Sequence, residues 1–370
     1  MLTLPILPSI VMTHAATSGL PAPKVLPLTV SHQNLLADAQ AAVLKLFPEW
    51  QAEDLDLFQC KDGITNKLVR CTNRKTNLAV LIRAYGKNSE LLIDRNQEVT
   101  NIRVLSQLGL CPPLYGKFNN GLVYGYVPGE VVHVSQLSDP HISRLVAHRL
   151  AEWHRVTIPG AKTAKLFVTL NQWLGEVRAV YANPSTAGTH DDPKLARFHT
   201  LFDLEALEQE MNFLRVALER INSPVVFSHN DLLSANVIYN AVDDSTNFID
   251  HEYASYNYRG FDIGNHFAEF AGFDCDYSLY PDRATQVEWL RNYLEAERRG
   301  KDSDQAAPVT EAEVDELYQE VNKFYLASHI YWGFWAMVQA SFSDIDFDYM
   351  GYARMRFDEY HRRRDELLAL

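Results

Sequence analysis

Three polar residues stand at a spacing suited to the transfer of a phosphoryl group. Asp231 follows His229 and Asn230, Asn236 comes five positions after Asp231, and Asp250 comes fourteen positions after Asn236. Asp231 can accept a proton from a hydroxyl, and the side-chain oxygens of Asn236 and Asp250 are ligands that hard Mg²⁺ prefers. H-x-D-x-x-x-x-N alone arises by chance in loops, but a second Asp after a short hairpin makes the pattern specific. The spacing predicts a phosphotransferase.

The residues around this trio have supporting roles that the sequence leaves partly open. His229 and Asn230 either shape the loop through hydrogen bonds to the backbone or take part in the chemistry. Glu252 either assists a metal ion through water or pairs with a neighbouring cation. Asp262, in an apolar run, is predicted to be a buried anchor that bonds the backbone amides of the catalytic loop.

A second group of residues, earlier in the chain, could hold phosphates. Gly63 permits close approach of the backbone, and Thr65 and Asn66 can donate hydrogen bonds, although a loop with one glycine is also an ordinary hairpin turn. Arg83 ends an apolar strand and could reach the phosphates, and Glu98 could hold Arg83 in place. The alternative is that Arg83 and Glu98 are both exposed.

The last third of the chain could form a site for a cation. Trp332 and Trp335 are three positions apart on a predicted helix and therefore share a face, and Tyr352 follows. Aromatic faces attract cations, although a stripe of aromatic residues at helical spacing can equally be core. Glu269, an acid among apolar residues, could offset the charge of a bound ammonium.

The elements that position these residues change in type along the chain. A strand-rich first third is followed by a helix-rich remainder, which predicts an α+β fold of two lobes with the active site in the cleft between them. We expect a disordered or strapping tail over residues 1–30, an N-lobe over 31–127 and a C-lobe over 128–370. Strands are predicted at residues 54–60, 68–71, 78–85, 114–118 and 122–127. A first helix is predicted to begin after an N-cap at Ser31, and further helices are predicted at 98–108, 142–153, 201–221, 285–299 and 321–340. A charged loop is predicted over 298–313.

Composition narrows the class of partner. The 370 residues have a net charge of −13, which argues against a nucleic-acid or anionic-membrane surface and fits a cationic small molecule. The four cysteines form no C-x-x-C pair, and the proline-broken N-terminal segment lacks the features of a signal peptide. No run is long and apolar enough to insert in a membrane. We therefore expect a cytoplasmic protein with reduced thiols.

Several segments resemble the choline/ethanolamine kinase family. The run from residue 249 to residue 267, which contains Ile-Asp-His-Glu-Tyr and Phe-Asp-Ile-Gly-Asn-His-Phe, is the most specific of them. The resemblance implies a protein-kinase-like fold with a small strand-rich N-lobe and a large helical C-lobe. It also implies ATP and Mg²⁺ as cofactors and phosphorylation of an amino alcohol in phospholipid synthesis. The other matching segments are residues 63–68, 81–86, 229–236, 332–335 and 349–353.

The resemblance assigns roles to individual residues. Asp231, Asn236 and Asp250 are expected to be catalytic, with Glu252 joining Asn236 and Asp250 as metal ligands. The expected substrate pocket contains Asp231, the acid Glu269 and the aromatic walls Trp332, Trp335 and Tyr352. ATP binding is assigned to Gly63, Thr65, Asn66, Arg83, Glu98, Tyr126 and Val127.

The choice of amine is the least determined part of the prediction. Residues 62–68, 269–272 and 276–281 are more similar to ethanolamine kinases than to choline kinases. A primary ammonium has N–H donors that need acceptors, and Asp274 and Asp276 are expected to take the place of aromatic residues. Ethanolamine is therefore predicted first, with choline kinase or a dual enzyme as the alternative. A catalytically inactive binding protein, an aminoglycoside kinase and a homodimer are also left open.

Overall fold

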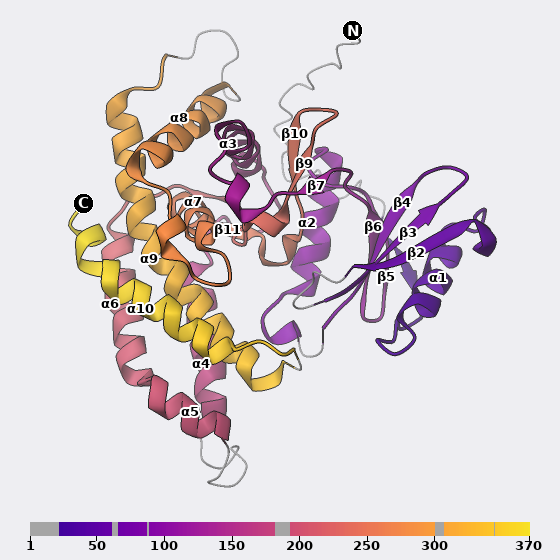
Figure 1. Cartoon of the computed structure of the whole chain (residues 1–370), viewed down its shortest axis with the longest axis horizontal. Coiled ribbons are helices and arrows are strands. Elements are labelled where there is room, and N and C mark those ends of the chain that lie inside the picture. Colours follow the sequence, from indigo (N-terminus) through magenta and orange to yellow (C-terminus); the bar gives the residue numbers. More distant parts are fainter. Residues whose placement is uncertain (1–21, 61–65, 87–88, 182–192, 300–306, 344) are drawn as a thin grey trace.

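The protein folds into a small lobe built on a sheet and a large lobe built mainly of helices (Figure 1). The computed structural model describes residues 22–60, 66–86, 89–181, 193–299, 307–343 and 345–370. The predicted α+β plan of two lobes is confirmed. The charged loop predicted near residue 300 lies partly outside the described residues.

The small lobe contains a six-stranded sheet with the order β1-β5-β6-β4-β3-β2. Neighbouring strands are antiparallel, except that β1 runs parallel to β5. β1 lies inside the segment predicted as a tail, of which residues 1–21 are outside the described residues. The strands are β1 (Lys24–Leu26), β2 (Leu55–Cys60), β3 (Lys67–Asn73), β4 (Ala79–Ala84), β5 (Leu114–Phe118) and β6 (Gly121–Gly125).

Two helices belong to this lobe. α1 (Leu35–Leu46) buries residues three and four positions apart against the sheet, in the core that also contains Val69 and Ile82. The predicted N-cap at Ser31 is wrong, because α1 begins at Leu35 and Asn34 takes the N-cap position. α2 (Arg95–Gln107) lies between the sheet and the large lobe (Figure 1).

The large lobe carries two small sheets near the cleft. β9 (Val237–Asn240) and β10 (Ser245–Phe248) form a hairpin that β7 (Glu130–Val131) extends, and β8 (Val225–Ser228) pairs with β11 (Ser255–Tyr258). These five short strands carry the catalytic segments at their ends. The short 3₁₀ turns are η1 (Ala52–Asp54), η2 (Ser89–Leu91), η3 (Val134–Gln136), η4 (Ser234–Asn236), η5 (His251–Tyr253), η6 (Glu269–Ala271) and η7 (Tyr277–Leu279).

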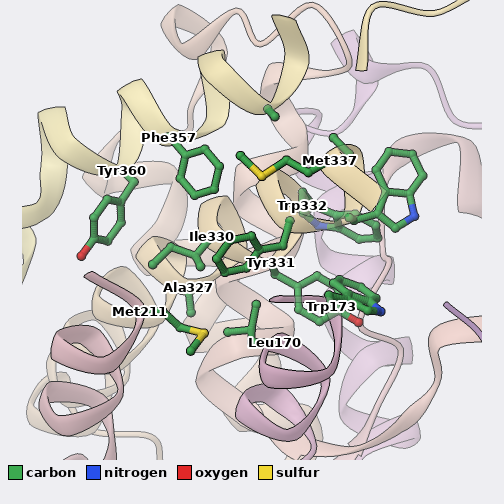
Figure 2. Packing of buried hydrophobic residues seen from close by; sticks show 14 of the residues in the cluster. Leu170, Trp173, Met211, Ala327, Ile330, Tyr331, Trp332, Met337, Phe357 and Tyr360 are labelled. Carbon is green, nitrogen blue, oxygen red and sulfur yellow. The ribbon is translucent and has the colours of Figure 1, made fainter. Parts of the chain in front are cut away.

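Eight helices of the described residues make up the body of the large lobe. α9 runs through it, and α7, α10 and α4 pack around α9. Figure 2 shows part of this core, where Leu170 and Met211 from neighbouring helices lie close to Ala327 and Ile330 of α9. The helices are α3 (Pro140–His154), α4 (Leu166–Tyr181), α5 (Pro193–Leu201), α6 (Leu204–Glu219), α7 (Arg259–Ala268), α8 (Arg283–Arg299), α9 (Glu311–Phe342) and α10 (Tyr349–Leu368).

The crossing of α7 and α9 depends on a glycine. A Cβ atom at Gly264 would lie 2.8 Å from both the backbone nitrogen of Tyr325 and the backbone oxygen of Val321. No side chain fits at that distance, so glycine is required for the two backbones to meet. This close packing fixes the position of α7, which carries Asp262 and Asn265 to the catalytic loop.

Several predicted helix boundaries are wrong for identifiable reasons. α9 begins ten residues before the predicted start at residue 321, because Thr310 and Glu313 form a capping box. The helix predicted over 201–221 is α6, which begins three residues later than predicted because Asp203 caps it. α2 begins at Arg95, where the carboxylate of Asp94 accepts two backbone N–H groups. None of the described helices is long and apolar enough to cross a membrane.

Candidate active site

A cavity of about 610 Å³ lies between the two lobes and contains most of the predicted site residues. β2, β3, β4 and β6 line it from the small lobe, and the loops after β8 and β10 line it together with α9 and α10 from the large lobe. The predicted residues that line it are Asn66, Arg83, Tyr126, Val127, Asp231, Asn236, Asp250, Glu252, Glu269, Trp332, Trp335 and Tyr352. Gly63 and Thr65 lie outside the described residues.

The catalytic loop begins where β8 ends, and its turn is built by side chains. Asn230 has the left-handed φ of 64°, and its amide donates to the backbone oxygen of Tyr253 at 2.9 Å and to the hydroxyl of Ser255 at 3.0 Å. The ring of His229 contacts the backbone oxygen of Ile249 at 3.0 Å. His229 and Asn230 therefore shape the loop, as the first of the two predicted roles requires.

Asp262 of α7 anchors the catalytic loop through its carboxylate. Its two carboxylate oxygens accept the backbone N–H groups of His229 at 2.8 Å and Asn230 at 2.7 Å. His154 lies 2.9 Å from the same carboxylate. Burial opposes ionisation of Asp262, but the hydrogen bond from His154 and the backbone bonds outweigh it, so the pKa lies below its ordinary value. The predicted buried anchor is confirmed.

Asn236 lies between Asp231, the predicted base, and Asp250, the predicted metal ligand; Asn236 and Asp250 together are called the metal position. Its amide nitrogen donates to the backbone oxygen of Asp231 at 2.8 Å and to the carboxylate of Asp231 at 3.1 Å. Because these bonds use the amide nitrogen, the amide oxygen of Asn236 is the atom left to bind a cation. The β9–β10 hairpin then brings Asp250 close, since the N–H of Ile249 donates to the backbone oxygen of Asn236 at 3.0 Å.

Asp231 lies in an environment that favours proton uptake. Burial is the main reason that its pKa lies well above the ordinary value, and the charges of Asp250 and Glu269 add to the effect. The side chain lines the cavity although only 9% of the residue is exposed. A carboxylate in this position can accept the proton of a bound hydroxyl.

The donor set at the metal position fits Mg²⁺. Asp250 adopts the left-handed φ of 61°, and one third of its side chain is exposed toward the cavity. Asp250 and Asn236 offer oxygen atoms only, which suits a hard cation that completes its shell with phosphate oxygens and water. Within the described residues no group of three His, Cys, Asp or Glu side chains could hold a metal by itself. The site is thus suited to a metal ion that arrives with phosphate.

A buried charge cluster lies beside the metal position. Arg83 is 3% exposed and pairs with Glu98 at 3.2 Å, with Asp250 at 2.9 Å and with Glu252. Glu252 also pairs with Arg95 at 3.0 Å. Of the two roles predicted for Glu252, the structure therefore shows the one in which it pairs with a neighbouring cation. The exposed alternative for Arg83 and Glu98 is wrong, because both are buried. Arg95, whose guanidinium lies 3.8 Å above the ring of Tyr85, is a member that the sequence did not reveal.

The aromatic end of the cavity is formed by the predicted residues of α9 and α10. The rings of Trp332 and Trp335 are 5.5 Å apart and nearly perpendicular, and Tyr352 lies 6.4 Å from Trp335. The indole N–H of Trp332 donates to Asn265 at 2.7 Å, and that of Trp335 donates to the hydroxyl of Tyr253 at 2.8 Å. These bonds fix the orientations of the two indole rings, and all three aromatic side chains line the cavity, where aromatic faces can attract a cation.

Two details of this end differ from the sequence prediction. Glu269 lines the cavity, but its carboxylate is already paired with the buried Arg356 at 3.1 Å. Asp274 and Asp276 are exposed and do not line the cavity, whereas the neighbouring Phe273 does. The argument for ethanolamine from these two aspartates is therefore wrong. Their place within an irregular turn decides which side chain faces inward, and no periodic pattern signals it.

The two lobes and the Asp-Asn-Asp site together define a protein-kinase-like phosphotransferase. The sequence profile of the choline/ethanolamine kinase family matches residues 57–361, so the chain belongs to this family. Mouse (Mus musculus) ethanolamine kinase 1 is 42% identical over 360 residues, which cover 95% of this chain and 96% of that protein. Drosophila melanogaster ethanolamine kinase is 44% identical over 292 residues, which cover 79% of this chain and 55% of that protein.

Solved structures show the same fold. The ethanolamine kinase of Plasmodium vivax has a TM-score of 0.78 and 26% identity, covering 89% of each chain. The choline kinase of Cryptosporidium parvum has a TM-score of 0.71 and 24% identity, covering 90% of this chain and 96% of that one. The chain is a member of a kinase family and therefore uses a nucleotide.

Proposed function

We propose that this protein transfers the γ-phosphoryl group of ATP to the hydroxyl of ethanolamine, with Mg²⁺, and yields phosphoethanolamine for phosphatidylethanolamine synthesis. One observation carries the proposal. A single cavity joins the Asp231–Asn236–Asp250 site to the pocket of Trp332, Trp335, Tyr352 and Glu269. A small molecule with a hydroxyl at one end and an ammonium at the other fits such a cavity. The ethanolamine kinases among the relatives support the same substrate.

The residues divide the reaction between them. Asp231 accepts a hydrogen bond from the attacking hydroxyl and takes its proton as the new P–O bond forms and the bond to ADP breaks. Asn236 and Asp250 would hold Mg²⁺, which would neutralise charge on the phosphates. Arg83 is placed by Glu98 to stabilise phosphate oxygens, and Asn66, Tyr126 and Val127 line the nucleotide part of the cavity.

The amine end supports a primary ammonium. Glu269 and Asp231 offer carboxylate oxygens to N–H donors, and the rings of Trp332 and Trp335 add cation–π attraction. Choline has no N–H donor, so it gains cation–π attraction and the attraction of its charge to the carboxylates, but no hydrogen bond to them. Ethanolamine is therefore the preferred substrate and choline the weaker one.

A substrate series tests the proposal. kcat/KM is measured with ATP-Mg²⁺ for ethanolamine, its N-methyl and N,N-dimethyl derivatives and choline, with Asp231→Ala as the inactive control. We expect kcat/KM to fall as methyl groups are added, because each one removes an N–H donor. A preference for choline would reverse the assignment, and the absence of ATP turnover with every amine would favour an inactive binding protein.

A further inference from the structure

Arg356 is a fully buried cation behind the amine end of the cavity, and the proposed reaction does not use it. It lies on α10 with 0% of its surface exposed. One terminal nitrogen, Nη1, donates to the Glu269 carboxylate at 3.1 Å and to the Tyr352 hydroxyl at 3.3 Å. The other, Nη2, donates to the hydroxyl of Ser328 at 2.8 Å. Arg356 thus touches two walls of the cavity without lining it.

The contacts of Arg356 continue to the catalytic loop. The Ser328 hydroxyl donates to the side-chain oxygen of Asn265 at 2.7 Å, and Trp332 donates to the same oxygen at 2.7 Å. The amide nitrogen of Asn265 donates to the backbone oxygen of Asn230 at 3.2 Å. A continuous chain of hydrogen bonds therefore runs from Arg356 to the residue that precedes Asp231.

A buried guanidinium at this place needs a reason beyond packing. Burial of an ion pair gives little net stability, because desolvation opposes the attraction between the charges. Arg356 bonds only one oxygen of Glu269, Oε1, while the Glu269 side chain lines the cavity. The planar fork of the guanidinium fixes the directions of both its partners, which a lysine ammonium does not do.

We propose that Arg356 is a positioning residue that directs Glu269 at the substrate ammonium, and thereby sets the preference for a primary amine. The proposal rests on the function proposed above and deepens it. Ethanolamine donates N–H bonds and needs a carboxylate acceptor at a fixed place. Choline has no N–H donor, so its binding depends much less on where Glu269 points.

Electrostatics gives the same role to Arg356. Burial raises the pKa of Glu269, and Arg356 counteracts that rise. The other groups that face Glu269 are Asp231 from the catalytic loop, Tyr352 from α10 and Cys275 from the turn after η6. None of these is a cation, so without Arg356 the pKa of Glu269 would rise further.

The test is a double-mutant cycle of Arg356→Met and Glu269→Gln in the full-length chain. We expect each single change to raise KM for ethanolamine roughly 10- to 100-fold, which is the effect of losing one charge-assisted hydrogen bond, with a smaller change in kcat. KM for choline should rise several-fold less. Because Arg356 acts through Glu269, adding Arg356→Met to Glu269→Gln should change KM for ethanolamine by less than about threefold.

Two further variants separate positioning from stability. Arg356→Lys keeps the charge and should recover part of the affinity for ethanolamine, because Glu269 stays ionised. Glu359→Gln removes another buried charge of α10, which accepts from Tyr325 at 2.9 Å and does not line the cavity. We expect this control to lower the melting temperature and leave the ratio of the two KM values unchanged.

The pH profile adds a readout that a structural role would not move. In Arg356→Met, the loss of kcat/KM for ethanolamine on acidification should begin at a higher pH than in the wild type, because the pKa of Glu269 loses the cation that lowers it, whereas Arg356→Met should cause no such shift when Glu269 is already Gln. The double variant leaves no unpaired buried charge. If Arg356→Met alone does not fold, the double variant is compared with Glu269→Gln instead.

A failure of the role proposed for Arg356 can be distinguished from a failure of the proposed function. Additive effects in the cycle, or equal rises in KM for ethanolamine and choline, would overturn the role of Arg356 while the wild type still phosphorylates ethanolamine. A wild type without ethanolamine kinase activity would instead overturn the proposed function itself.

Discussion

The two ends of the cavity are built in different ways. The phosphate end is a cluster of charges drawn from both lobes, in which Arg83 of β4 meets Glu98 of α2 and Asp250 of the large lobe. The amine end belongs to the large lobe alone and consists of rings fixed by hydrogen bonds, with Trp332 and Trp335 as its main walls. The first end therefore depends on how the lobes meet, whereas the second is complete within one core.

This difference separates the expected effects of mutation. Groups at the phosphate end act on charge that develops during transfer, so their loss should lower kcat. Groups at the amine end bind the ammonium equally before and during the reaction, so their loss should raise KM.

Asp231→Ala should lower kcat for ethanolamine by roughly 100- to 10,000-fold, because the attacking hydroxyl loses its base. The measurement is steady-state release of ADP at saturating ethanolamine. A buried carboxylate with a raised pKa destabilises the fold at neutral pH, so the melting temperature of the variant should be equal or higher. A kcat close to that of the wild type would remove Asp231 from the proton transfer.

Asp262→Ala should lower the free energy of unfolding by about 3–5 kcal/mol, because His154 and two backbone N–H groups lose their buried partner. Urea unfolding followed by tryptophan fluorescence measures this change. kcat should fall as well, since the loop that carries Asp231 is no longer anchored. Full stability of the variant would contradict the anchoring role.

The contribution of Asp262 should depend on pH. Its pKa is lowered in the folded state, so its contribution to stability is complete above the ordinary pKa of about 4 and is lost as the pH falls below it. The difference in unfolding free energy between the wild type and Asp262→Asn should therefore shrink in acid. A difference that stays constant down to pH 3 would show that the charge of Asp262 is unimportant.

Asp250→Asn should lower kcat on the order of 100-fold and raise the Mg²⁺ concentration needed for half-maximal rate, because a neutral amide binds the cation less well. Titration of Mg²⁺ at saturating ATP measures both effects. The matched control is Asp243→Asn on the exposed turn of the same hairpin, which should behave as the wild type. Normal activity of Asp250→Asn at high Mg²⁺ would remove Asp250 from the metal site.

Trp335→Ala should raise KM for ethanolamine roughly 3- to 30-fold with little change in kcat, which corresponds to the loss of one cation–π contact. Trp335→Phe keeps an aromatic face and should recover part of the affinity. Initial rates over a range of ethanolamine concentrations give both constants. A large fall in kcat with an unchanged KM would contradict the division between the two ends.

Much of the site was readable because it depends on residues close in sequence. The hairpin between Asn236 and Asp250 is local, so spacing alone places their oxygens together, and the helical repeat places Trp332 and Trp335 on one face. The fold class followed from the change from strands to helices. Helix ends were less well predicted, although the capping box at Thr310 was present in the sequence.

The reaction class, the family resemblance and the aromatic character of the pocket could all be predicted from the sequence alone. Which distant charges pair depends on tertiary packing, as in the contact of Arg83 with Asp250 across the cleft and that of Arg356 with Glu269 within the large lobe. The residues of each pair are more than eighty positions apart, and no periodic pattern connects them. A buried charge needs a partner because it has lost its water. The packing of the elements around it determines which residue that partner is.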